Sequence, residues 1–153
     1  MTDKVYLDAN ILIAHQVSNH QYHTRAMDII DRIWKKRHSF VISSLTWDEF
    51  FYGLIFILQS VAKDKTKTSF DLHTQVISEA TEKVFSWERL ELVEFRHNPT
   101  EVKIVLKNMQ RYNLRPRDAF HLCIMQQQNI RQIATFDHDF NRIKEKGGLI
   151  ILG

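Results

Sequence analysis

The sequence has few of the residues that cross-link or interrupt a chain: one Cys, two Pro and four Gly among 153 residues. A single cysteine, Cys123, excludes an intramolecular disulfide, so we interpret it as a small core residue and expect a reducing, cytoplasmic setting. The scarcity of Pro and Gly argues against long flexible linkers. These absences favour a single domain over residues 1–153.

Long hydrophobic runs are also missing. The longest apolar stretch, residues 50–58, is broken by Tyr52 and Gly53 and is far shorter than the roughly 20 residues of a membrane-spanning helix. The charged first residues lead directly into a short apolar run, without the pattern of a signal peptide. We therefore expect no association with a membrane.

Charge of one sign is not abundant either. The formal net charge is +3 at pH 7, and the pI is about 9.0. A mild basic excess suits a polyanionic partner such as a nucleic acid, but it does not identify one. Hydrophobic residues make up 44% and charged residues 25%, which is typical of soluble globular proteins. Composition therefore predicts a soluble globular protein, and only the motifs can indicate its function.

Apolar periodicity divides the chain into alternating strands and helices. This alternation predicts an α/β fold with a mostly parallel central sheet flanked by helices. The polar segment Lys63–Ser69 is the best candidate for an exposed loop. The expected strands are 4–7, 39–43, 90–95, 130–136 and 149–152, and the expected helices are 11–16, 23–37, 46–62, 70–86, 100–112, 116–128 and 140–144.

Acidic side chains recur near the ends of these predicted strands. Asp8 closes the first strand, Glu49 begins the helix after the second, Asp118 lies in the first turn of a later helix, and Asp137 follows the fourth strand. The carboxyl ends of parallel strands share one edge of a sheet, where ligands of such folds bind. The pattern therefore predicts that these acids lie close together.

Each of these acids, taken singly, also has a purely structural explanation. Thr46 and Glu49 have the spacing of a capping box, and Asp8 and Asp137 are suited to N-cap positions. Asp118 would be stabilised by the dipole of its own helix. Capping is the more common role at any one position, but it does not explain why the acids recur at one edge.

A cluster of carboxylates needs a cation to neutralise it, unless some of its members stay protonated. Hard oxygen ligands of this kind suit Mg²⁺ or Mn²⁺. A metal ion held in this way lowers the pKa of a bound water and offsets negative charge on a phosphodiester in the transition state. The acids therefore point to metal-dependent hydrolysis, with one or two ions.

The sequences around the acids resemble the motifs of PIN-domain ribonucleases, in the order of that family and over nearly the whole chain. No single motif is specific, but the occurrence of all of them in order is. The closing segment 147–152 is similar to the final strand of the family. The matching motifs are Tyr6–Ile13 around Asp8 and Asn10, Ile42–Leu54 around Glu49, Arg117–Cys123 around Asp118, and Ile133–Phe140 around Asp137.

The resemblance implies a PIN-like nuclease domain that cleaves RNA with Mg²⁺ or Mn²⁺ bound to Asp8, Glu49, Asp118 and Asp137. Asn10 and Thr135 would then orient these acids or a bound water. Among PIN domains the chain looks most like VapC-type toxins, which are inhibited by a small antitoxin protein and often form homodimers. Two features depart from the pattern: Ala9 replaces a frequent Ser or Thr, and Lys63–Ser69 lengthens the middle helical region.

Several assignments near the motifs remain open. Asp139 competes with Asp137 as the fourth acid; we prefer Asp137 and interpret Asp139 as the cap of the turn at 140–144. His121 lies one helical turn after Asp118, where it is either a satisfied structural histidine or a hydrogen-bond partner of the acids. Arg115 and Arg117, beside Asp118, are candidates either for contact with an RNA phosphate or for pairing with the acids.

The main alternative to a nuclease is a catalytically inactive PIN-like domain that binds RNA or protein. The presence of all four acids argues against a loss of activity. The sequence does not identify the RNA target, because RNA recognition depends on surface shape and loops rather than on the acids.

Overall fold

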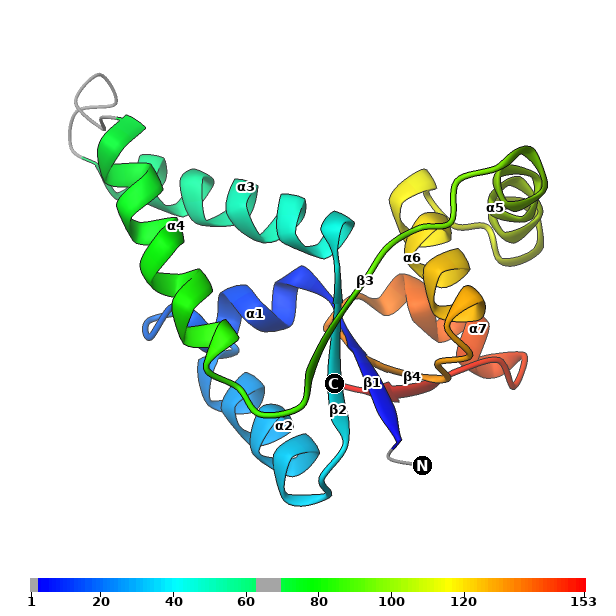
Figure 1. Ribbon diagram of the computed structural model, residues 1–153, viewed down its shortest axis with the longest axis horizontal. Helices are drawn as coiled ribbons and strands as arrows, with labels where there is room; N and C mark the ends of the chain where they lie inside the picture. The colour runs from blue at the N-terminus through cyan, green and yellow to red at the C-terminus, as the bar shows by residue number, and fades with distance from the viewer. Residues whose placement is uncertain (1–2, 63–69) are drawn as a thin grey trace.

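The computed structural model describes residues 3–62 and 70–153. Strands and helices alternate along the chain, as the sequence predicts (Figure 1). The expected loop at Lys63–Ser69 lies outside the described residues. The elements are β1 (Lys4–Leu7), α1 (Ala9–Gln16), α2 (His23–Lys35), β2 (Ser39–Ser43), α3 (Ser44–Val61), α4 (Phe70–Phe85), β3 (Leu90–Val93), α5 (Pro99–Tyr112), α6 (Pro116–Gln127), β4 (Gln132–Ala134), the 3₁₀ turn η1 (His138–Phe140), α7 (Asn141–Glu145) and β5 (Ile150–Leu152).

The strands form one five-stranded sheet in the order β3-β2-β1-β4-β5. All four pairings are parallel, so the prediction of a mostly parallel sheet is confirmed. In the registers of the central strand, Tyr6 lies opposite Val41 of β2 and Ile133 of β4. The first strand in the sequence is therefore the middle strand of the sheet, and its carboxyl end opens between two neighbours.

Helices cover both faces of the sheet (Figure 1). Strand alternation assigns neighbouring residues of β1 to opposite faces. Val5 and Leu7 pack in the core with α1 to α4, whereas Tyr6 packs in the core with α5 to α7. All three side chains are completely buried. Burial on both sides explains why β1 reads as a continuous apolar run.

Helices α1 and α3 approach closely on the first of these faces. A Cβ atom at Gly53 of α3 would collide with the Ile13 side chain of α1. Glycine at this position lets the two helices pack with the Ile13 side chain in its present place; a larger residue would force that side chain to move. Their contact matters for function because α1 begins directly after Asp8 and α3 carries Glu49.

The predicted elements are all present, but some end earlier than their apolar pattern suggests. The strand expected over 130–136 covers only Gln132–Ala134. The backbone amides of Phe136 and Asp137 instead donate hydrogen bonds to side chains, to Asn10 Oδ1 at 3.1 Å and to Thr135 Oγ1 at 2.9 Å. The chain after β4 therefore forms hydrogen bonds with polar side chains instead of continuing the sheet. Within residues 3–62 and 70–153, no helix combines the length and apolar character needed to cross a bilayer.

Candidate active site

The four predicted acids lie around one cleft at the carboxyl edge of the sheet. Asp8 follows β1, Glu49 projects from α3, Asp118 lies in the first turn of α6, and Asp137 follows β4. All four line a cavity of about 310 Å³, together with Ala9, Asn10, Ile13, Tyr52, Gly53, Phe56, Arg117 and His121. The structure thus brings together side chains that are as many as 129 positions apart in the sequence (137 − 8).

Asp8 is the most deeply buried of the acids, with 9% of the residue exposed. Its Oδ2 atom accepts hydrogen bonds from Thr135 Oγ1 at 2.6 Å and from Asn10 Nδ2 at 2.9 Å. Burial raises the pKa of this carboxyl, while His121 and the Thr135 hydroxyl partly oppose that rise. Asp8 occupies the N-cap position of α1, but its side chain makes no capping hydrogen bond. Its carboxylate is thus turned toward the cleft rather than toward the helix end.

Asn10 and Thr135 connect Asp8 to the loop that carries Asp137. Asn10 donates to Thr135 Oγ1 at 3.2 Å as well as to Asp8, and its own Oδ1 accepts the amide of Phe136. Thr135 is 2% exposed and accepts the amide of Asp137. These two side chains therefore hold the carboxylate of Asp8 and the backbone at Phe136 and Asp137 in fixed positions.

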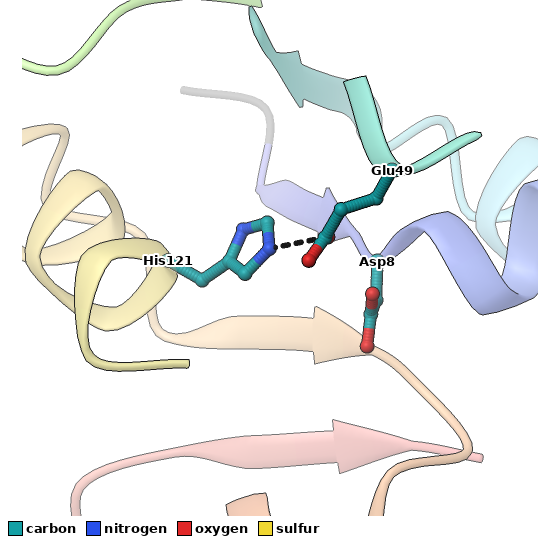
Figure 2. A group of neighbouring side chains, drawn as sticks. All are labelled: Asp8, Glu49 and His121. Atoms are coloured by element: carbon teal, nitrogen blue, oxygen red, sulfur yellow. Dashed lines mark hydrogen bonds and ion pairs between the residues drawn. The ribbon is translucent and has the colours of Figure 1, made fainter. Parts of the chain in front are cut away.

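Glu49 is held by a histidine from a helix on the other face of the sheet. His121 Nε2 lies 2.8 Å from Glu49 Oε2, and Figure 2 shows the two side chains pointing toward one another beside Asp8. Because a carboxylate only accepts hydrogen bonds, Nε2 is the donor. The Thr46–Glu49 capping box is wrong: Ser43 caps α3 by accepting the amide of Thr46, which leaves Glu49 free to face the cleft.

A buried hydroxyl chain continues behind His121. The Tyr6 hydroxyl lies 2.7 Å from His121 Nδ1 and 2.6 Å from Ser43 Oγ. In a neutral ring that donates from Nε2, Nδ1 is the acceptor, so Tyr6 donates to it and accepts from Ser43. Burial raises the pKa of Tyr6 far above its usual range, which keeps its proton in place. Both ring nitrogens of His121 thus have a partner, Nε2 in Glu49 and Nδ1 in Tyr6, and the ring orientation that serves Glu49 is held from behind.

Arg117 supplies the positive charge nearest to Glu49. Its guanidinium lies 3.3 Å from Glu49 Oε1 and 3.6 Å from Asp48 Oδ2. Burial alone would raise the pKa of Glu49, but His121 and Arg117 outweigh it and hold that pKa below its ordinary value. Glu49 is therefore a carboxylate at neutral pH. Arg115 is exposed and lies at the N-cap of α6, outside this set of contacts.

Asp118 and Asp137 form a second group with Asp139. Their ligand oxygens all lie within 4.8 Å of one another. Burial, reinforced by the neighbouring charge of Asp137, raises the pKa of Asp118 to about 6. The prediction that Asp139 caps the following turn is wrong: Asp137 caps η1 by accepting the Asp139 amide at 2.8 Å, and Asp139 pairs with Arg142 at 3.1 Å. Asp137, and not Asp139, lines the cleft with Asp8 and Glu49.

The donor set of the cleft fits a divalent cation. Asp8, Glu49 and His121 also have ligand atoms within 4.8 Å of one another, so two such groups lie side by side. Burial is the main cause of the raised pKa values of Asp8 and Asp118, and the charges of neighbouring acids add to it, so a bound cation would stabilise both carboxylates. Oxygen-rich sites of this kind suit Mg²⁺ or Mn²⁺.

Sequence reasoning did not identify Tyr6 and Ser43 as part of the site. A tyrosine in the middle of a completely buried strand is the signal that was available, since a buried hydroxyl needs a hydrogen-bond partner. Phe50 is buried in the core, whereas Tyr52 and Phe56 line the cleft with 71% and 66% exposure.

Comparison with known proteins identifies the family and the fold of this chain. The family model described as the PIN domain matches residues 5–146. Mycobacterium tuberculosis VapC20, a toxin that cleaves the sarcin–ricin loop, is similar in structure, with a TM-score of 0.62, 14% identity, and coverage of 96% of this chain and 97% of that one. VapBC2 from Rickettsia felis, solved with a promoter DNA fragment, has a TM-score of 0.61, 18% identity and 96% coverage of both chains.

A toxin–antitoxin complex from Klebsiella pneumoniae is also similar, with a TM-score of 0.57, 18% identity and 96% coverage of both chains. A search of curated proteins found no match. At these identities the solved structures show a shared fold, and the family assignment rests on the family model that matches residues 5–146.

Substitution of Tyr6 by Phe tests the hydroxyl chain. The change removes the donor to His121 Nδ1 and the acceptor for Ser43 while it preserves the ring, so it leaves buried polar atoms unpaired. We expect the free energy of unfolding, measured by urea denaturation, to fall by about 1–3 kcal/mol. Tyr112→Phe is the matched control, because the Tyr112 hydroxyl makes no hydrogen bond with the described residues. Equal effects of the two substitutions on the free energy of unfolding would contradict the proposed hydrogen bonds of the Tyr6 hydroxyl.

Proposed function

The chain belongs to the PIN-domain family, and from this premise we propose that it is a divalent-metal-dependent endoribonuclease, the toxin of a toxin–antitoxin pair. The observation that carries the proposal is the convergence of Asp8, Glu49, Asp118 and Asp137 on one cleft. Asp137 caps η1, but neither Asp8 nor Glu49 makes a capping hydrogen bond. Capping therefore does not account for Asp8 and Glu49, whose carboxylates are available for chemistry.

In this proposal the four carboxylates hold Mg²⁺ or Mn²⁺. When bound, the ion would lower the pKa of a water and offset charge on the scissile phosphate. Thr135 and Asn10 keep Asp8 in a fixed orientation, and His121 does the same for Glu49. Fixed orientation matters because a preorganised site does not have to reorganise as charge develops in the transition state.

Two arginines at the start of α6 are proposed to contact the RNA. Arg117 already pairs with Glu49 and Asp48, so a phosphate in the cleft would compete for a guanidinium that is in place. Arg115 is exposed two positions before it. Together they would offer positive charge beside the acids, where the polyanionic substrate must enter.

The proposed partners follow from the same premise. The chain and VapC20 cover each other almost completely, and two of the similar structures are a VapBC pair and a toxin–antitoxin complex. We propose that a small antitoxin protein inhibits this protein and that two copies of this chain form a homodimer. Toxin and antitoxin would both act in the cytoplasm. Exposed aromatic side chains on α3, Tyr52 and Phe56, are available for such contacts.

Metal-dependent RNA cleavage is the first test of the proposed function. Purified protein should degrade single-stranded RNA in Mg²⁺ or Mn²⁺, and EDTA should stop the reaction. Asp8→Asn keeps the shape of the side chain but removes a ligand charge, so cleavage should fall by at least about 100-fold while the fold, followed by circular dichroism, is retained. The matched control is Asp28→Asn, an exposed acid on α2, which should cleave like the wild type.

Equal cleavage by wild type and Asp8→Asn would mean that the activity belongs to a contaminant, and the assignment would fail. No cleavage by a wild type that still binds RNA would favour the alternative, an inactive PIN-like binding domain.

Growth arrest is the test of the toxin assignment. Expression of this chain alone should stop growth of a bacterial host, whereas expression of Asp8→Asn at the same level should not. Co-expression of the small protein encoded next to it should restore growth. Normal growth with confirmed soluble wild-type protein would contradict the toxin assignment without affecting the nuclease assignment.

A further inference from the structure

A second cavity adjoins the acid cleft on the side of β4 and β5. It has a volume of about 190 Å³, and its walls come from α2, the end of β4, the turn after it and α7. Asp137 lines both this cavity and the cleft, so the two meet at that residue. We call it the flanking pocket and define it by Tyr22, Arg25, Phe136, Asn141 and Lys144.

The flanking pocket holds two cationic side chains that make no ion pair within the described residues, and the carboxylate of Asp137 also lines it. Arg25 and Lys144 both line it, and neither forms an ion pair with another residue in the described ranges 3–62 and 70–153. Arg142, also on α7, is by contrast paired with Asp139. The pocket thus combines two available cations with the polar side chain of Asn141, a combination suited to a phosphate.

Two aromatic side chains, Tyr22 and Phe136, also line the flanking pocket. The rings of Tyr22 and Phe136 are 4.8 Å apart with an interplanar angle of 34°, and the Arg25 guanidinium carbon lies 5.5 Å from the centroid of Phe136. Tyr22 remains 38% exposed, so part of its ring is open to a further planar group. Aromatic rings and arginine planes are the surfaces on which unpaired bases stack in RNA complexes.

We propose that the flanking pocket binds the nucleotide next to the scissile phosphate of a single-stranded RNA. Arg25 and Lys144 bind its phosphate, and its base packs on the Tyr22 ring. The inference rests on the proposed function, because it needs the scissile phosphate at the acids that include Asp137. Because Asp137 lines both cavities, an RNA strand with its scissile phosphate at the acids would place the adjacent nucleotide in the flanking pocket.

Binding without cleavage separates this pocket from the catalytic acids. In an Asp8→Asn background, the affinity for a fluorescein-labelled, mixed-sequence single-stranded RNA is measured by anisotropy over a range of salt concentrations. Arg25→Gln with Lys144→Gln should weaken binding about tenfold or more and reduce the salt slope by about 1. Tyr22→Leu should weaken binding about tenfold and leave the salt slope unchanged.

The matched control is Lys103→Gln with Lys107→Gln, which changes the net charge by the same amount on exposed positions of α5. The first half of α5 adjoins the far end of α6, where Gln127 contacts Glu101 at 2.8 Å. This control should stay within about twofold of its parent. Thermal unfolding of every variant checks that the fold is retained, and Lys144→Gln alone replaces the double variant if the latter unfolds.

Equal loss of binding in the pocket and control variants would show general charge attraction and would overturn the proposal. Unchanged binding in the pocket variants would overturn it as well. If wild type does not cleave RNA and Asp8→Asn does not bind it, the proposed function itself fails, and the pocket assignment fails with it.

Discussion

The repulsion between carboxylates at one edge of the sheet is the constraint on which the rest of the site depends. Four acids line a single cleft, and burial makes their negative charge more costly. The fold counters this cost unequally. Asp8 accepts two hydrogen bonds, and Glu49 is stabilised by contacts with His121 and Arg117. Asp118 is compensated less, and its pKa is raised to about 6. The remaining imbalance is what a divalent cation would correct, and it links the architecture to the proposed chemistry.

The central strand organises both halves of this arrangement. Its last residues alternate between the two faces of the sheet: Leu7 packs with α1 to α4, and Tyr6 reaches through its hydroxyl to His121 of α6. Asp8 then follows at the edge itself. One short segment therefore positions an acid, contacts the histidine that holds a second acid, and joins the two cores. We therefore expect a substitution of Tyr6 to alter the position of His121 and Glu49, although Tyr6 does not line the cleft.

Much of the fold could be predicted from the sequence because apolar periodicity reports local burial directly. The order of elements, the parallel sheet and the four acids at its edge followed from that pattern and from the family motifs. What could not be predicted depends on contacts between distant positions: Tyr6 with His121, Ser43 rather than Thr46 as the cap of α3, and Tyr22 against Phe136. The end of β4 was predicted too long, since an apolar residue such as Phe136 gives no sign that its amide bonds to a side chain.

The most direct test of this account is Mn²⁺ binding followed by electron paramagnetic resonance. The wild type should bind Mn²⁺ at pH 7.5 and lose affinity as the pH falls through about 6, because protonation of Asp118 competes with the ion. Glu49→Gln should weaken binding at least about tenfold, whereas Glu82→Gln, an exposed acid on α4, should not. Equal Mn²⁺ affinity in the wild type and Glu49→Gln, with no dependence on pH, would contradict the claim that the acids converge to hold a metal.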